Sequence, residues 1–135
     1  MTDLQNIMKG HLKLDLGAFS LDSGEFEIPL QGVTVLFGRS GSGKSTLLRA
    51  ISGLDQRTEG TLTVGDEIWQ AGVSVLPTQK RHIGFVFQDA ALFPHMTVRQ
   101  NLMYGVNRLP KGIESENFED IVQRVGVADK LDRAV

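Results

Sequence analysis

The fold of this chain is decided by the stretch Gly38-Arg39-Ser40-Gly41-Ser42-Gly43-Lys44-Ser45-Thr46. It fits the pattern G-x-x-x-x-G-K-[ST], a glycine-rich loop that holds nucleotide phosphates and is called a P-loop. The apolar run 33–37 before the loop predicts a short strand, and the pattern of 44–51 after it predicts a helix ended by Gly53. Strand, loop and helix in this order are the context that a P-loop requires.

The residue types of the loop suit phosphate chemistry. Glycines allow successive backbone N–H groups to point at phosphate oxygens, and the helix that follows adds the positive end of its dipole. We expect Lys44 to reach the β- and γ-phosphates, the Ser45 hydroxyl to bind Mg²⁺, and Thr46 to contact a phosphate oxygen. A glycine-rich turn that binds nothing would need neither Lys-Ser after its last glycine nor an apolar strand before its first. The loop 38–46 is therefore the predicted nucleotide-binding site.

Composition narrows the class of protein. The chain has 135 residues, of which 41% are hydrophobic and 22% charged, as expected for one modest globular core. A net charge of −2 gives no electrostatic reason to expect nucleic-acid binding. The absence of cysteine excludes disulfides, thiolate zinc sites and cysteine nucleophiles.

Hydrophobic patterns predict the remaining elements. Strands are expected at 11–16 and 25–30 as an antiparallel hairpin, at 61–64 and 67–70 around a turn, weakly at 73–75, and at 83–87 as a buried strand of a parallel sheet. Helices are expected from the capping box at Thr97 to Val106, and around Phe118, Ile121, Val122 and Val125 up to Gly126. In the helix after the P-loop, we expect Leu47, Leu48 and Ile51 to share the buried face.

A second constellation selects one class of P-loop protein. The segment Lys80-Arg81-His82-Ile83-Gly84-Phe85-Val86-Phe87-Gln88-Asp89 is followed by Ala90-Ala91-Leu92-Phe93-Pro94-His95-Met96-Thr97-Val98-Arg99-Gln100-Asn101-Leu102. Here the chain resembles the ATP-binding subunit of an ABC transporter, and the segment resembles that family's Q-loop. The resemblance extends from His11 to about Val135. It implies an α/β P-loop NTPase core with a mixed sheet and an N-terminal antiparallel hairpin, truncated before the signature motif and Walker B strand. Residues 1–135 would form the N-terminal portion of a single nucleotide-binding domain.

The resemblance also implies roles for individual residues. ATP and Mg²⁺ would be the cofactors, with Lys44 and Gln88 catalytic, and Gln88 reaching the metal or the attacking water. Phe19 is the candidate to stack on the adenine, although a core phenylalanine is the equal alternative. Trp69 is interpreted as packing, and His95 receives no catalytic role.

The resemblance implies partners as well. Leu92, Phe93, Pro94 and Met96 would face the membrane subunits of the transporter, or else pack within their own loop. A second ATP-binding subunit would complete a homodimer, and a solute-binding protein would act indirectly. The expected location is cytoplasmic, on the inner face of the membrane. The detail of 32–38, 50–54 and 88–95 is similar to the molybdate-importing members, while importers of other anions, sugars or polyamines stay open.

Three parts of that family's machinery do not occur in the sequence: the Leu-Ser-Gly-Gly-Gln signature, the Walker B Asp-Glu and the switch histidine. We therefore expect this chain to bind Mg-ATP without turnover, although the full-length parent would hydrolyse ATP. Two alternatives are a small kinase or ATPase that uses Asp89 as its Walker B acid, and a non-hydrolysing nucleotide-binding module. The absence of Asn-Lys-x-Asp disfavours a GTPase.

Overall fold

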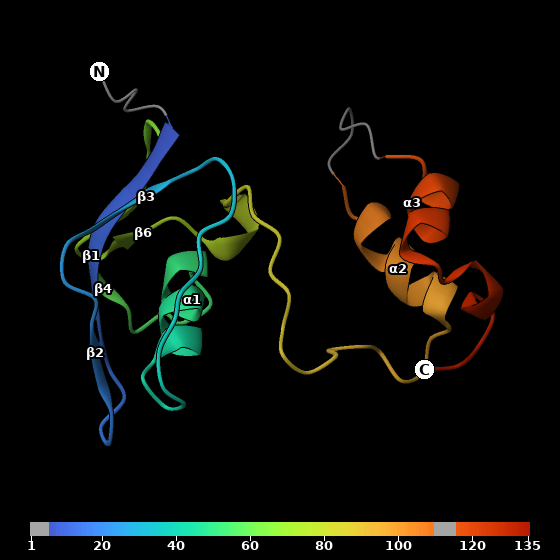
Figure 1. Cartoon of the computed structure of the whole chain (residues 1–135), viewed down its shortest axis with the longest axis horizontal. Coiled ribbons are helices and arrows are strands. Elements are labelled where there is room, and N and C mark those ends of the chain that lie inside the picture. Colours follow the sequence, from blue (N-terminus) through green and yellow to red (C-terminus); the bar gives the residue numbers. More distant parts are fainter. Residues whose placement is uncertain (1–5, 110–115) are drawn as a thin grey trace. The chain divides into compact units, whose positions relative to one another are not determined.

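The computed structural model describes residues 6–109 and 116–135. They belong to two compact units, residues up to Phe85 and residues from Val86 onward, and each unit is described by itself (Figure 1). In the described part of the chain, no helix is long and apolar enough to cross a membrane.

The first unit is built on an antiparallel sheet with the strand order β2-β1-β4-β5-β6, in which β3 also pairs with β1. The strands are β1 (Ile7–Asp15), β2 (Ser20–Asp22), β3 (Phe26–Pro29), β4 (Glu59–Val64), β5 (Glu67–Ala71) and β6 (Ser74–Val75). The predicted N-terminal hairpin is confirmed, because β1 pairs antiparallel with both β2 and β3. Strand β1 starts four residues earlier than the predicted strand 11–16, and two short strands, β2 and β3, pair with it where a single strand 25–30 was predicted. The predicted pair at 61–64 and 67–70 is confirmed as β4 and β5.

Helix α1 (Lys44–Ser52) packs on the sheet through a small apolar core (Figure 1). Leu12, Ala50, Leu62 and Trp69 form this core, which confirms the packing role predicted for Trp69. The predicted helix face is wrong at one position, because Leu48 is 48% exposed and Ala50 is fully buried. Counting from Leu47, helical spacing returns to the same face at residues 50 and 51, whereas the adjacent residue 48 points away. Gly53 ends α1 as predicted.

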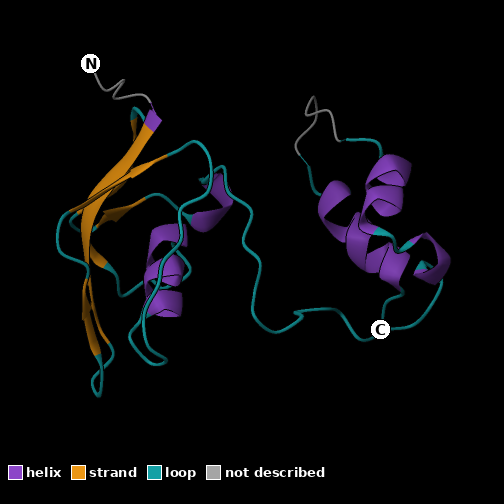
Figure 2. Cartoon of the chain, in the orientation of Figure 1, coloured by secondary structure: helices purple, strands orange, loops and turns teal. Residues whose placement is uncertain are grey.

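Two predicted strands are wrong. Segments 33–37 and 83–87 are loops, as Figure 2 shows for the stretch before α1. Val33, Val35 and Phe37 expose 91%, 77% and 95% of their surface, and Val86 exposes 95%. A strand exists only when a neighbouring strand accepts and donates its backbone hydrogen bonds, and within the described residues no strand pairs with either segment. An apolar run identifies a strand-forming sequence but does not supply its neighbour.

The second unit holds α2 (Val98–Val106), α3 (Phe118–Val125) and a short 3₁₀ helix, η3 (Ala128–Lys130). The predicted capping box is confirmed: the Thr97 hydroxyl accepts from the Gln100 N–H at 3.2 Å, and the Gln100 side chain accepts from the Thr97 N–H at 2.8 Å. Helix α3 ends at Gly126 as predicted, and Val122 is its buried residue. Both helices therefore start and end where local sequence chemistry places them.

Candidate nucleotide-binding site

The P-loop enters α1 through a glycine that no other residue can replace without cost. Gly43 has a φ of 93°, in the left-handed region, and is the residue that begins the helix. A Cβ at this position would lie 2.9 Å from the Phe19 ring and 3.2 Å from Leu21. Backbone conformation and close packing thus require glycine for independent reasons.

The start of α1 is open. Among the residues that the structure describes, no side chain caps it, and the first intrahelical bond runs from the Leu47 N–H to the Gly43 carbonyl at 2.8 Å. The N–H groups of a first helical turn have no intrahelical acceptor, and the helix dipole places partial positive charge beside them. An uncapped start of this kind, following a glycine-rich loop, fits a phosphate group.

Lys44 folds back over the P-loop. Its Nζ donates to the Arg39 carbonyl at 2.6 Å and the Gly38 carbonyl at 2.9 Å, and lies 3.5 Å from the Ser42 hydroxyl. These acceptors are neutral, and no carboxylate within the described residues pairs with this ammonium group. The positive charge of Lys44 is therefore positioned at the loop and not neutralised, which suits a polyanionic ligand.

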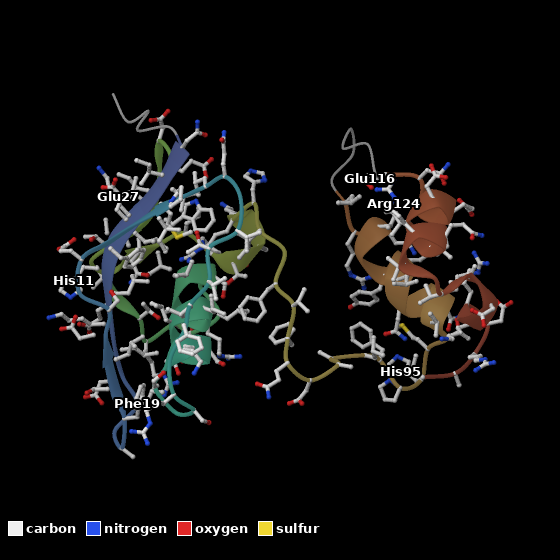
Figure 3. The ribbon with its side chains drawn as sticks, in the orientation of Figure 1. His11, Phe19, Glu27, His95, Glu116 and Arg124 are labelled. Atoms are coloured by element: carbon white, nitrogen blue, oxygen red, sulfur yellow. The ribbon has the colours of Figure 1, made fainter. Side chains whose placement is uncertain are left out.

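The structure brings Phe19 to the same place. Phe19 lies in the turn between β1 and β2, where the Leu16 N–H donates to its carbonyl at 2.8 Å (Figure 3). Its half-buried ring lies against Gly43, at the entrance to α1. This contact suits a base-stacking residue next to a phosphate loop, and it equally suits simple packing. The role of Phe19 toward adenine stays a prediction.

The chemistry of a metal site can be judged from the donors present. Ser45 is exposed in the first turn of α1, where its hydroxyl is available. No cluster of three or more histidine and acidic side chains occurs among the described residues. Mg²⁺ prefers oxygen ligands and often takes several of them from substrate phosphates. The residues around Ser45 fit a Mg²⁺ ion that arrives with its nucleotide better than one held by the protein alone.

Gln88 and Asp89 lie in the second unit, where both are exposed in a loop. Their predicted roles toward the nucleotide therefore stay predictions.

The loop after Gln88 is held by a residue whose role the sequence analysis missed. The Asn101 side chain accepts from the Phe93 N–H at 2.8 Å and donates to the carbonyls of Phe93 at 3.2 Å and Thr97 at 3.0 Å. The available signal was an asparagine in the first turn of a capped helix. Phe93 packs on Tyr104 with ring centroids 4.4 Å apart, whereas Leu92 is 52% exposed. Phe93 therefore fits the packing interpretation of this loop, and the contact of Leu92 with a membrane subunit stays a prediction.

One ion pair organises the turn that leads from α1 into β4. Arg57 donates to both carboxylate oxygens of Asp55, at 3.0 and 2.8 Å. These hydrogen bonds lower the pKa of Asp55 and raise the pKa of Arg57 from their ordinary values. The pair fixes the turn in which the Thr58 hydroxyl also donates to the Asp55 carbonyl at 2.8 Å.

Comparison with known proteins identifies the class. The model of the ABC transporter family matches residues 21–135, and the chain therefore belongs to the ABC transporter family. Its α/β fold with a P-loop agrees with that assignment.

Individual relatives carry a more specific name. The chain is similar to the molybdenum import ATP-binding protein ModC of Thiobacillus denitrificans, with 44% identity over 126 residues, covering 93% of this chain and 34% of that protein. Molybdenum import ATP-binding protein ModC 1 of Azotobacter vinelandii is 42% identical over 129 residues, covering 93% of this chain and 35% of the relative. ModC of Hahella chejuensis is 50% identical over 107 residues, covering 79% and 30%. The chain spans about a third of the length of these relatives.

Proposed function

We propose that this chain binds Mg-ATP as the N-terminal portion of a nucleotide-binding domain, in the ATP-binding subunit of an ABC importer. The observation that carries the proposal is the uncapped start of α1, with the ammonium group of Lys44 held at 2.6 and 2.9 Å from carbonyls of the preceding loop. A helix start with a poised cation and no acidic partner is suited to a triphosphate.

We assign each residue of the loop a role in binding the nucleotide. The backbone N–H groups of Gly38, Arg39, Ser40, Gly41, Ser42 and Gly43, together with those of Lys44, Ser45 and Thr46, surround the phosphates. Lys44 exchanges its loop carbonyls for β- and γ-phosphate oxygens, and the Ser45 hydroxyl holds Mg²⁺. A bound Mg²⁺ ion would neutralise negative charge on the phosphate oxygens. Phe19, which lies against Gly43, stacks on the adenine.

Gln88 completes the proposal from the second unit. Its neutral amide can bind Mg²⁺ through oxygen, or orient water, and release either without a change of protonation. Gln88 precedes the loop in which the Phe93 N–H donates to the Asn101 side chain. A movement of that loop would therefore displace Gln88 through the connecting backbone.

Transport and partners follow from the relatives' printed function. We propose that the solute is molybdate, since the similar proteins of Thiobacillus denitrificans and Azotobacter vinelandii are named for molybdenum import. Two such subunits would pair beneath transmembrane subunits on the cytoplasmic face, fed by a solute-binding protein. A cleft of about 590 Å³ beside α2, lined in part by Met96, Arg99, Tyr104 and Arg108, supports a partner surface on the second unit.

We propose that the 135 residues bind without steady-state turnover. Hydrolysis needs a carboxylate to polarise water and a signature motif to face the P-loop, and neither sequence occurs here. Membership of the ABC transporter family disfavours a compact kinase that uses Asp89. A nucleotide-binding module without hydrolysis is therefore the expected behaviour of this chain.

Calorimetric titration of the purified chain with Mg-ATP tests the proposal, with phosphate release assayed in the same sample. Lys44→Ala should weaken binding by at least about tenfold, because a charge-assisted hydrogen bond is worth about 1.5–3 kcal/mol. Lys80→Ala removes an exposed lysine of the 3₁₀ turn η2 (Thr78–Lys80) and should leave binding unchanged. Equal affinity of wild type and Lys44→Ala would disprove the P-loop assignment, and phosphate release would return Asp89 to consideration.

A further inference from the structure

Arg81 is a buried cation of the first unit. It follows η2 and exposes only 4% of its surface. Among the residues that the structure places, no carboxylate lies within ion-pairing distance of it. Burying a guanidinium is unfavourable unless its N–H groups find acceptors, and burial lowers the pKa of Arg81 from its ordinary value. An arginine guanidinium stays charged in proteins, so the surroundings of Arg81 must supply those acceptors.

Three backbone carbonyls from separate parts of the first unit supply them. Arg81 donates through Nη1 to Ile51, through Nε to Leu76 at 2.9 Å, and through Nη2 to Trp69 at 3.3 Å. Ile51 is in the last turn of α1, Trp69 is in β5, and Leu76 follows β6. The guanidinium also lies over the Trp69 ring, 5.4 Å from its centroid. One side chain therefore ties the end of α1 to the sheet.

The end of α1 is shaped around this guanidinium. Gly53 ends the helix with a φ of 75°, and a Cβ there would lie 2.7 Å from the Arg81 Cζ. The last carbonyls of a helix carry partial negative charge, so a cation bonded to Ile51 is favourable there. Arg49, in the same last turn, is exposed and offers a natural comparison.

The N-terminal end of α1 directly follows the P-loop. Nine residues make α1 about 13 Å long, so a rigid shift of the helix at its Ile51 end also displaces its first turn. We propose that Arg81 is a positioning residue for the P-loop: by fixing the Ile51 end of α1 on the sheet, it sets where the first-turn N–H groups meet phosphate. The proposal rests on the nucleotide binding proposed above.

Hydrogen exchange and Mg-ATP titration of the 135-residue chain test this together. In Arg81→Met, which keeps much of the side-chain volume but removes every donor, exchange within 43–52 should accelerate about tenfold or more while β1 stays protected. Mg-ATP affinity should fall about tenfold. Arg49→Gln removes a cation from the same helix end and should change neither quantity.

Each outcome is decisive. Equal acceleration in β1 and α1 would show that Arg81 supports the whole fold and would overturn the proposal, as would unchanged exchange and affinity. If wild type does not bind Mg-ATP, the proposed function fails, and selective loosening of 43–52 in Arg81→Met still decides whether Arg81 positions the loop. If Arg81→Met does not fold, Arg81→Lys keeps the charge with fewer donors in a different geometry. Selective loosening of α1 in that variant supports the proposal, and wild-type exchange overturns it.

Discussion

Helices α1 and α2 are both nine residues long, but they begin in opposite ways. The start of α2 is closed: Thr97 and Gln100 form a capping box, and the N–H groups of Val98 and Arg99 donate to the carbonyls of Arg133 and Leu131 at 3.0 and 2.8 Å. The start of α1 has a left-handed glycine, and no side chain in the described part of the sequence caps it. Helix starts are normally satisfied by the protein, so the open one marks the place for an external anion.

The difference between the two helix starts comes from the residue at each N-cap position. Where α2 has a threonine whose hydroxyl bonds the helix, α1 has Gly43, which has no side chain to offer. A cap on α1 would stabilise the helix and occupy the same N–H groups that a phosphate needs. The first-turn N–H groups of α1 therefore stay open to a ligand, whereas those of α2 are satisfied by the protein.

The largest effect should come from adding a single carbon atom at the open start. Gly43→Ala forces a left-handed alanine and pushes its Cβ against Phe19, so Mg-ATP affinity should fall about tenfold more than in Gly41→Ala. Gly41 is the matched control, because its φ is 77° but a Cβ there meets nothing within 4 Å. Calorimetry on both variants measures the difference.

The contact with Phe19 can be separated from the backbone strain. In a chain that already carries Phe19→Ala, a Cβ at Gly43 loses its 2.9 Å contact with the ring, while the 3.2 Å contact with Leu21 remains. Adding Gly43→Ala to this variant should therefore cost less Mg-ATP affinity than Gly43→Ala costs in wild type. A full penalty in the Phe19→Ala background would mean that the shape of the helix start, and not the ring beside it, controls affinity.

A smaller effect is expected at the closed start. Thr97→Ala removes the hydroxyl that accepts from the Gln100 N–H, which should destabilise α2 by about 1 kcal/mol. Faster hydrogen exchange in 98–106 would report this loss, whereas Trp69 fluorescence and Mg-ATP affinity should not change. Thr97→Ser retains the hydroxyl and serves as the control. A loss of nucleotide affinity in Thr97→Ala would show that the two helix starts are not independent.

Local chemistry made much of the fold predictable. The capping box at Thr97, the helix stops at Gly53 and Gly126 and the turn between β4 and β5 depend on residues close in sequence, and all are confirmed. The segments 33–37 and 83–87 were wrongly predicted as strands because a strand depends on a distant neighbour. Their apolar residues indicate what could pair, and no local pattern states whether a partner strand is present.

In the candidate site, too, local features were predictable from the sequence and long-range contacts were not. The P-loop was evident from nine consecutive residues, and the structure adds the open helix start and the back-folded Lys44. In the sequence, Arg81 is only one residue of the segment that resembles the Q-loop. Its structural role is not evident there, because its acceptors come from residues 51, 69 and 76. A long-range arrangement of backbone carbonyls leaves no pattern in the neighbouring sequence.

The smallest expected effect lies on the sheet, away from both helix starts. The Gly24 N–H, His11 and Lys13 lower the pKa of Asp22 to about 2, through hydrogen bonds at 3.0 Å from Gly24 and 2.5 Å from His11, and an ion pair at 3.2 Å with Lys13 (Figure 3 labels His11). A carboxyl whose folded pKa is depressed contributes stability above its unfolded pKa and loses it as pH falls through the folded value. This contribution should disappear between about pH 4 and pH 2.

Urea unfolding at pH 5 and pH 2.5 measures the loss, with Asp22→Asn as the comparison. The wild type should lose more stability than Asp22→Asn over this interval, because the amide does not titrate. Asp55, whose pKa Arg57 also lowers, titrates in both proteins and cancels in the difference. Since Asp22 is highly exposed, water and salt screen its interactions, and the difference should shrink further at high ionic strength. Equal pH dependence in the two proteins would show that the charge of Asp22 contributes nothing to folding.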